Sequence, residues 1–320
     1  MNLVGALVTG LLLLAGHLGA AAVEPTTASR VQAGLLSPML QAVERLSPRL
    51  WVEPTRAGAP PRLDETPPPF VKIATRGRTI MIPSDCRFAG RYDLLIHFHG
   101  ATSTMEPLLE RSGLYAVFVV LNLGNGSGAY EDRFAGPAAF DGLLAAVDAR
   151  VKEHCHLEQP AADRIALSAW SAGYGAIWKI LARERDAQRI DAVLLADGLH
   201  AGFEPGHRGQ VNGLQMQPFT LFSYEAAAGE RLMAITHSHI VPPGYASTTQ
   251  TADHLLYANG LERQTVSLAY SRKGMVATSR AERGGFFVEG FEGQDARAHC
   301  DHLYGLGETL LPLLEQRWRE

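Results

Sequence analysis

Residues 164–184 read RIALSAWSAGYGAIWKILARE, and this stretch is the most informative part of the sequence. It begins with a short apolar run that predicts a buried strand and ends with apolar residues at helical spacing. Ser171 stands at the junction, with Ala169 two residues before it and Gly173 two residues after it. Small residues at these positions let the neighbouring backbone pass a serine on a sharp, exposed strand-to-helix turn. The stretch therefore predicts a nucleophile at Ser171, with an ordinary strand–helix turn as the alternative; Ser168, inside the strand, is a weaker candidate.

The segments on both sides of this turn alternate between strand-like and helix-like patterns. Continuous Val, Ile and Leu runs separated by helices are typical of a parallel sheet that is covered on both faces. We therefore predict an α/β fold with a mostly parallel central sheet and helices on both faces, in one catalytic domain over residues 70–320. The expected strands lie at 70–82, 92–98, 115–122, 164–169, 190–196, 231–236 and 285–290, and the expected helices at 105–112, 138–153, 173–183, 218–228, 248–257 and 302–318.

The composition excludes several classes of protein. Hydrophobic residues make up 46% of the 320 residues and charged residues 19%, which excludes a disordered chain, a coiled coil and a collagen-like repeat. The formal net charge is −4, so the chain has no excess of basic residues that would bind nucleic acid. We therefore expect no nucleic-acid partner. The oligomeric state stays open.

The N-terminal segment differs from the rest of the chain. Residues 1–22 are almost wholly apolar, with four consecutive leucines at 11–14 and alanines at 20–22, which predicts a signal peptide cleaved near Ala22. An uncleaved membrane anchor is the alternative. We expect the mature chain to be secreted or periplasmic, with no membrane partner after cleavage. Residues 23–69 contain two proline-rich pieces and are expected to form an N-terminal arm.

The three cysteines are Cys86, Cys155 and Cys300. Export would allow a disulfide to persist. Three pairings with one free thiol are possible, and so is no disulfide at all. Their wide spacing does not form a zinc knuckle.

Around Ser171 the chain resembles the α/β-hydrolase-fold serine hydrolases, particularly the esterase-like members, and the order of elements follows them over about residues 70–318. A second motif supports the resemblance, because the strand YDLLIHF runs into His99-Gly100-Ala101. It is similar to the family's His-Gly loop, which gives a backbone N–H to the oxyanion hole. The resemblance implies that Gly100 and Ala101 are the loop candidates for this role and that the N–H of Ala172 is the other donor.

A nucleophilic serine needs a neutral imidazole as base and a carboxylate that orients it. The family's order of residues places the base after the last strand, where we favour His299, expected in a loop, over His302, expected at the start of the helix. The acid is expected at Asp197, at the end of a strand. Asp295 and Asp301 are the substitutes for it.

Four aromatic side chains are expected to line the substrate pocket: His99, Trp170, Tyr174 and Tyr130. Tyr130 belongs to the glycine-rich loop 122–133, at the sheet edge where open α/β sheets bind ligands, and capping of that loop is its alternative role. Residues 203–222 are a candidate cap over the site.

The function these residues predict is that of an exported serine hydrolase, which cleaves a carboxylic ester of a small molecule or polymer through an acyl-enzyme. A peptidase or acyltransferase with the same triad, and a non-catalytic binding protein of the same fold, are the alternatives. No cofactor and no metal are expected. Three His-x-His pairs leave a zinc hydrolase as the remaining alternative, with His97/His99 and His237/His239 as a four-imidazole site and His154/His156 as the third pair.

Overall fold

The computed structural model describes residues 69–75, 77–272 and 274–320. The predicted signal peptide, and the arm as far as residue 68, lie outside the described residues. Across the described part of the chain, no helix has the length and apolar character needed to span a bilayer.

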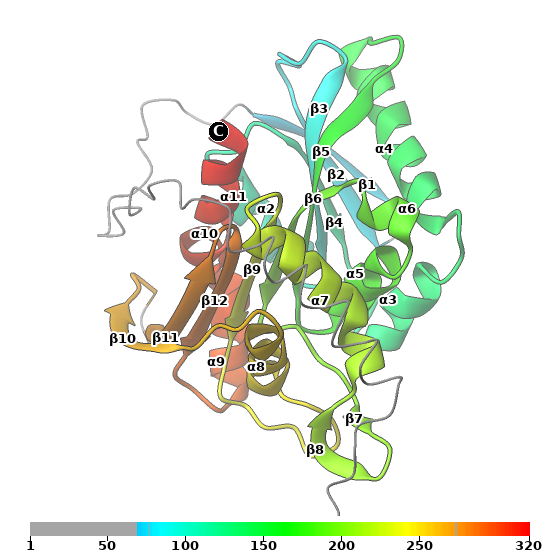
Figure 1. The fold of residues 1–320 in the computed structure, drawn as a ribbon. Coiled ribbons are helices and arrows are strands. Elements are labelled where there is room, and N and C mark those ends of the chain that lie inside the picture. Colours follow the sequence, from blue (N-terminus) through cyan, green and yellow to red (C-terminus); the bar gives the residue numbers. More distant parts are fainter. Residues whose placement is uncertain (1–68, 76, 273) are drawn as a thin grey trace, which may run out of the picture. The chain divides into compact units, whose positions relative to one another are not determined.

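A ten-stranded sheet forms the centre of the described structure, in the order β1-β2-β4-β3-β5-β6-β9-β12-β11-β10 (Figure 1). The six strands from β4 to β12 pair in parallel, while β1 and β2 at one edge and β11 and β10 at the other pair antiparallel. The bounds are β1 (Phe70–Thr75), β2 (Arg78–Pro83), β3 (Arg91–Phe98), β4 (Val117–Leu121), β5 (Ala161–Trp170), β6 (Ile190–Ala196), β9 (Leu232–His237), β10 (Gln264–Ala269), β11 (Val276–Arg283) and β12 (Phe286–Phe291).

Helices cover both faces of this sheet, because successive strand residues point to opposite sides and the central strands are apolar on both. One face packs against α3 (Ser127–Arg133), α4 (Ala139–Cys155), α5 (Tyr174–Leu181), α7 (Gly213–Ala227) and α8 (Thr248–Ala258). The other packs against α2 (Thr102–Glu110), α9 (Ala296–Tyr304), α10 (Leu306–Thr309) and α11 (Leu311–Arg319). The short α6 (Glu184–Ala187) follows α5. The predicted fold class is confirmed.

Several parts of the sequence-based assignment differ from the structure. The expected glycine-rich loop 122–133 is helical from Ser127, where α3 begins. The expected helix over 302–318 is three helices, the first of which begins at Ala296, and the chain turns at Gly305 between the first two. Strands β10 and β11 have no counterpart in the prediction. Most residues of β10 are exposed, so this antiparallel edge lacks the apolar run by which buried strands are recognised.

The expected cap over residues 203–222 is only partly a separate element. Its first half forms a hairpin of β7 (Phe203–Glu204) and β8 (His207–Val211). Its second half belongs to α7, which buries Met216 and Phe219 in the core and so is part of the main fold.

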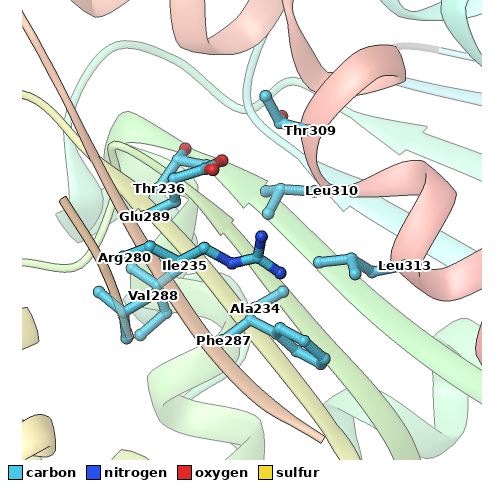
Figure 2. Close-up of a pocket in the computed structure, with 10 residues that line it drawn as sticks. All are labelled: Ala234, Ile235, Thr236, Arg280, Phe287, Val288, Glu289, Thr309, Leu310 and Leu313. Carbon is cyan, nitrogen blue, oxygen red and sulfur yellow. The ribbon is translucent and has the colours of Figure 1, made fainter. Parts of the chain in front are cut away.

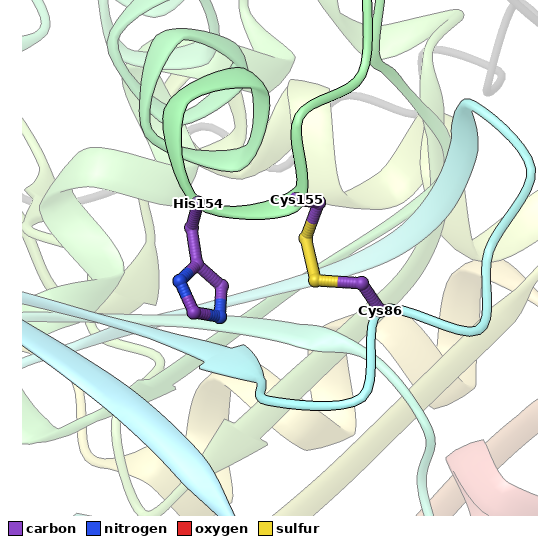
Figure 3. A group of neighbouring side chains, drawn as sticks. All are labelled: Cys86, His154 and Cys155. Atoms are coloured by element: carbon purple, nitrogen blue, oxygen red, sulfur yellow. A yellow bond between two sulfur atoms is a disulfide. The ribbon is translucent and has the colours of Figure 1, made fainter.

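A disulfide joins Cys86, in the turn after β2, to Cys155 at the end of α4, and Cys300 is a free thiol (Figure 3). This resolves the pairing that the sequence leaves open. His154 lies beside the disulfide, where its Nε2 is buried and has no hydrogen-bond partner among the described residues.

Candidate active site

Three neighbouring strands end at one edge of the sheet, and each is followed by a strained residue. His99 follows β3, Ser171 follows β5 and Asp197 follows β6, and the order of these strands in the sheet is β3-β5-β6. Their φ angles are 71°, 49° and 43°, in the left-handed region that side chains other than glycine rarely adopt. Among the described residues only Cys86 and His156 share this property outside glycine. Such strain concentrates at functional sites, where the surrounding structure maintains it.

Ser171 begins a short 3₁₀ turn, η1 (Ser171–Gly173), that leads from β5 into α5. Two glycines let this turn pack tightly. A Cβ on Gly173 would lie 2.2 Å from the backbone oxygen of Phe98, at the end of β3. A Cβ on Gly198, after β6, would lie 2.6 Å from the backbone nitrogen of Ser171. The predicted nucleophile turn is therefore packed between the ends of its two neighbouring strands.

The structure brings His299 and Asp197 together. The Nδ1–H of His299 donates a hydrogen bond of 2.7 Å to Oδ2 of Asp197. His299 lies in the first turn of α9, so the expectation of a loop position is wrong. The helix begins earlier than its apolar pattern because the Asp295 side chain caps it, accepting a 2.8 Å hydrogen bond from the Ala298 N–H.

Asp197 is almost fully buried, yet it is well supplied with donors. Its Oδ1 accepts hydrogen bonds from the N–H of Ser238, at 2.8 Å, and from the hydroxyl of Thr248, at 2.6 Å. Burial by itself raises the pKa of Asp197, but the hydrogen bond from His299, the nearby His302 imidazole and the Thr248 hydroxyl together bring it below its ordinary value. The carboxylate is therefore ionised at neutral pH.

The other candidates for base and acid have different partners. The ring of His302 is buried, and its Nδ1 forms a 2.8 Å hydrogen bond with Oγ1 of Thr236. Asp295 is the helix cap just described. Asp301 forms ion pairs with Arg272 and Arg297. The structure thus pairs His299 with Asp197 and gives these three residues structural contacts.

The loop after β3 lies beside the Ser171 turn. Gly100 is buried with a φ of 119°, and a Cβ there would lie 3.3 Å from the Leu303 side chain. Ala101 is the N-cap residue of α2. Because Gly173 packs on Phe98, the 3₁₀ turn that contains Ala172 is adjacent to this loop.

The four residues expected to line the substrate pocket have different surroundings. His99 and Trp170 stack in parallel, with ring centroids 5.0 Å apart. Tyr130 is fully buried, and its hydroxyl accepts a 3.1 Å hydrogen bond from the Leu123 N–H. Its burial and this bond favour the alternative role, since Tyr130 stands on α3 and its hydroxyl anchors the loop that precedes this helix. Tyr174 is half-buried and packs edge-on against His200, at 5.6 Å.

Several residues at this edge were not identified from the sequence. Ser238 and Thr248 support the carboxylate, and His200 packs edge-on against Tyr245, with centroids 5.1 Å apart. They lie in the segments that follow β6 and β9. Only their position after a parallel strand could have identified them, because the carboxyl ends of such strands meet at one edge of the sheet. A Ser or Thr in a loop belongs to no sequence motif by itself.

The four-imidazole metal site is contradicted by the sheet order. β5 and β6 separate β3 from β9, so His97 and His237 are about 14 Å apart at the usual strand spacing. Both ring nitrogens of His97 have hydrogen-bond partners: Nδ1 bonds to the Ser168 hydroxyl, and Nε2 bonds to the His99 backbone oxygen. Within the described ranges, the metal-type side chains that cluster are Cys86, His154 and Cys155, and here both sulfur atoms belong to the disulfide.

A small pocket lies under α10 and α11 (Figure 2). Glu289 of β12 lies between Thr236 and Arg280 on the neighbouring strands. Its Oε2 accepts a 2.7 Å hydrogen bond from the Tyr270 hydroxyl, and its Oε1 has no partner among the described residues. None of the proposed triad residues lines this pocket.

The known proteins that this chain resembles are similar to it only at low identity. No family model and no curated protein matches it. Solved structures similar to it include the enterobactin esterase of Shigella flexneri, at 16% identity and a TM-score of 0.46, over 79% of this chain and 62% of that one. A poly(3-hydroxybutyrate) depolymerase from Bordetella parapertussis is similar at 14% identity and a TM-score of 0.40, over 79% of this chain and 96% of that one. A thermostable esterase is similar at 12% identity and a TM-score of 0.44, over 77% of this chain and 62% of that one. We therefore argue the function from the geometry of the site.

Proposed function

We propose that this chain is an exported serine hydrolase that cleaves a carboxylic ester through an acyl-enzyme intermediate. The observation that carries the proposal is the hydrogen bond between His299 and the buried Asp197 carboxylate, beside a strained serine on a strand-to-helix turn. This combination of nucleophile turn, imidazole and carboxylate is the arrangement that serine hydrolases use.

In this mechanism each residue has one role. Ser171 attacks the ester carbonyl carbon while Nε2 of His299 takes the hydroxyl proton. Asp197 accepts the Nδ1–H, which fixes the tautomer that leaves Nε2 free to act as a base. The same His299 proton then passes to the departing alkoxide, so that an alcohol leaves and an ester of Ser171 remains. Water repeats the sequence and releases the acid.

The negative charge of the tetrahedral intermediate needs donors. The N–H groups of Ala172 and of the Gly100–Ala101 loop are the proposed pair, because the 3₁₀ turn and the loop after β3 are adjacent. Backbone N–H groups fixed in this way stabilise an oxyanion without reorganising during the reaction. The amino end of α5 adds a favourable field.

Export is supported by two independent features. The N-terminal 22 residues have the pattern of a signal peptide, and the Cys86–Cys155 disulfide is a bond that persists in oxidising compartments. Thiol titration of the denatured, unreduced protein from an exporting host should detect one thiol per chain, from Cys300. Three thiols, in a protein that retains its N-terminus, would contradict export.

Turnover of short p-nitrophenyl esters tests the enzyme proposal against the alternatives. Hydrolysis by the wild type, and its loss in Ser171→Ala, would support an ester hydrolase. A panel of peptides and acyl acceptors distinguishes a peptidase or acyltransferase, which would act on amides or transfer the acyl group with the same triad. A folded wild type without turnover on any of these substrates would favour the binding-protein alternative.

A further inference from the structure

The indole of Trp170 packs against two imidazole rings. The His99 ring stacks on it at 5.0 Å with an interplanar angle of 8°, and the His299 ring packs on it at 4.8 Å and 31°. The three rings come from the loop after β3, the end of β5 and the first turn of α9. A row of rings therefore connects the nucleophile turn to the proposed base.

Hydrogen bonds fix both ends of this row. The Nε1–H of Trp170 donates to the backbone oxygen of His299 at 2.9 Å, so the indole holds the backbone as well as the ring of the base. At the other end, Nδ1 of His99 is 2.9 Å from the hydroxyl of Tyr130. Tyr130 is in turn anchored by Leu123, as described above. Each end of the row therefore has a hydrogen-bond partner in the fold.

The indole of Trp170 can also stabilise positive charge on the proposed base. The face of an indole attracts a cation, and His299 becomes an imidazolium when it takes the serine proton. Burial, and the positive charge that His299 acquires, lower the pKa of His99. His99 therefore stays neutral when His299 is charged, and does not oppose the charge that the indole stabilises.

We propose that Trp170 is a positioning residue for His299, which it orients through the hydrogen bond to the backbone and stabilises as an imidazolium through its ring face. His99 and Tyr130 hold the indole in place. This inference rests on the proposed function, and it reassigns His99 and Trp170, which the sequence suggested as substrate-lining residues.

Two substitutions separate the roles of the ring and its N–H. Trp170→Leu removes both, while Trp170→Phe keeps an aromatic ring and loses the hydrogen bond to His299. Trp178→Phe is the matched control, because Trp178 lies on α5 and packs at the edge of the core. Circular dichroism establishes that each variant is folded.

The decisive measurement is the protonation of His299 as a function of pH. It is monitored by NMR of the imidazole and by the acidic limb of the pH profile of kcat/KM. In Trp170→Leu the loss of the indole should lower the apparent pKa of this limb by roughly half a unit to one unit. It should also reduce kcat about 2- to 30-fold, with KM nearly unchanged. Trp170→Phe should lower kcat with a smaller shift of the limb. The charged or titratable groups near His299, which these variants keep, are Asp197, His99, His200 and His302.

A substrate-lining role would give the opposite pattern. Raised KM, with kcat and the acidic limb unchanged in both variants, would overturn the inference. The NMR titration needs no turnover. An inactive wild type would therefore refute the proposed function, while the titration would still test whether Trp170 stabilises the His299 imidazolium. If Trp170→Leu does not fold, Trp170→Phe decides: unchanged kcat and an unchanged titration would overturn the inference.

Discussion

The Nδ1 atom of His299 lies 2.7 Å from Oδ2 of Asp197, although 102 residues separate them in the chain. The carboxylate receives two further hydrogen bonds, from Ser238 and Thr248, on its other oxygen. Three donors therefore fix its plane, and the imidazole must align with it. A buried carboxylate held in this way can keep one tautomer of a histidine throughout a catalytic cycle.

Replacement of Asp197 by asparagine tests this relationship. The amide keeps the size of the side chain, but it can donate to Nδ1 and so favours the wrong tautomer of His299. We expect kcat to fall by about 10³- to 10⁴-fold with KM little changed. Steady-state kinetics on a p-nitrophenyl ester measures this, and a loss below tenfold would show that another group orients the base.

Two histidines one helical turn apart should differ sharply in importance. His299→Ala removes the proposed base and should reduce kcat by about 10⁴-fold or more. His302→Gln removes a ring bonded to Thr236 and should leave kcat within roughly tenfold, with a stability loss of about 1–3 kcal/mol. Kinetics and urea unfolding of both variants check this. The reverse order of activities would reassign the base to His302.

Gly198 should be intolerant of even one added methyl group. A Cβ there would lie 2.6 Å from the Ser171 nitrogen and 2.9 Å from its oxygen, so Gly198→Ala must displace the nucleophile turn. Since small misplacements of reacting groups are costly, kcat/KM should fall about 100-fold. The control is Gly142→Ala in α4, where nothing lies within 4 Å of the added atom. It should keep full activity and gain up to about 1 kcal/mol of stability.

Buried histidines should make the fold sensitive to acid. Burial lowers the pKa of His97 to about 3, and the pKa of His237 is likewise lowered to about 3. An unfolded histidine titrates near pH 6.5, so between about pH 6.5 and 3 the unfolded chain binds protons that the folded chain does not. Stability is therefore complete above this range and is lost as the pH falls through it.

The corresponding variant is His97→Gln. Urea unfolding between pH 4 and 6 should give a free energy of unfolding that rises with pH less steeply in the variant, by up to about 1.4 kcal/mol per pH unit. The variant should be less stable than the wild type at pH 7, because the bonds of His97 to Ser168 and to the His99 backbone are altered. Equal slopes in the two proteins would show that His97 is protonated in the folded state.

The central sheet could be predicted from the sequence because its strands are buried. The expected strand at 190–196 coincides with β6 (Ile190–Ala196), since the apolar residues that predict it are the ones the strand buries in the core. The edge strand β10 could not be predicted in this way, because an exposed strand has no run of apolar residues. At the break, Gly305 lies so close to Met275 that a Cβ would be 2.4 Å from its sulfur, a contact between distant parts of the chain that the local sequence does not show.

The proposed site could be predicted only in part. Ser171 has a local signature, and Asp197 ends a recognisable strand, so both could be selected by position. The role of Tyr130 depends on its burial, and the ring row of Trp170 depends on three elements that meet only in the fold. Ser238 and Thr248 contact the carboxylate from a loop and a helix whose sequences give no sign of it.

Labelling of the purified mature protein with a fluorophosphonate probe is the sharpest test of Ser171 as the nucleophile, since the probe reacts with serine hydroxyls that an imidazole activates. The proposed mechanism predicts stoichiometric labelling of the wild type at Ser171, and no labelling of Ser171→Ala, which should fold normally because the substitution removes only a half-buried hydroxyl. Asp197→Asn should be labelled far more slowly. A folded wild type that the probe does not label, or equal labelling of Ser171→Ala, would refute the proposed role of Ser171.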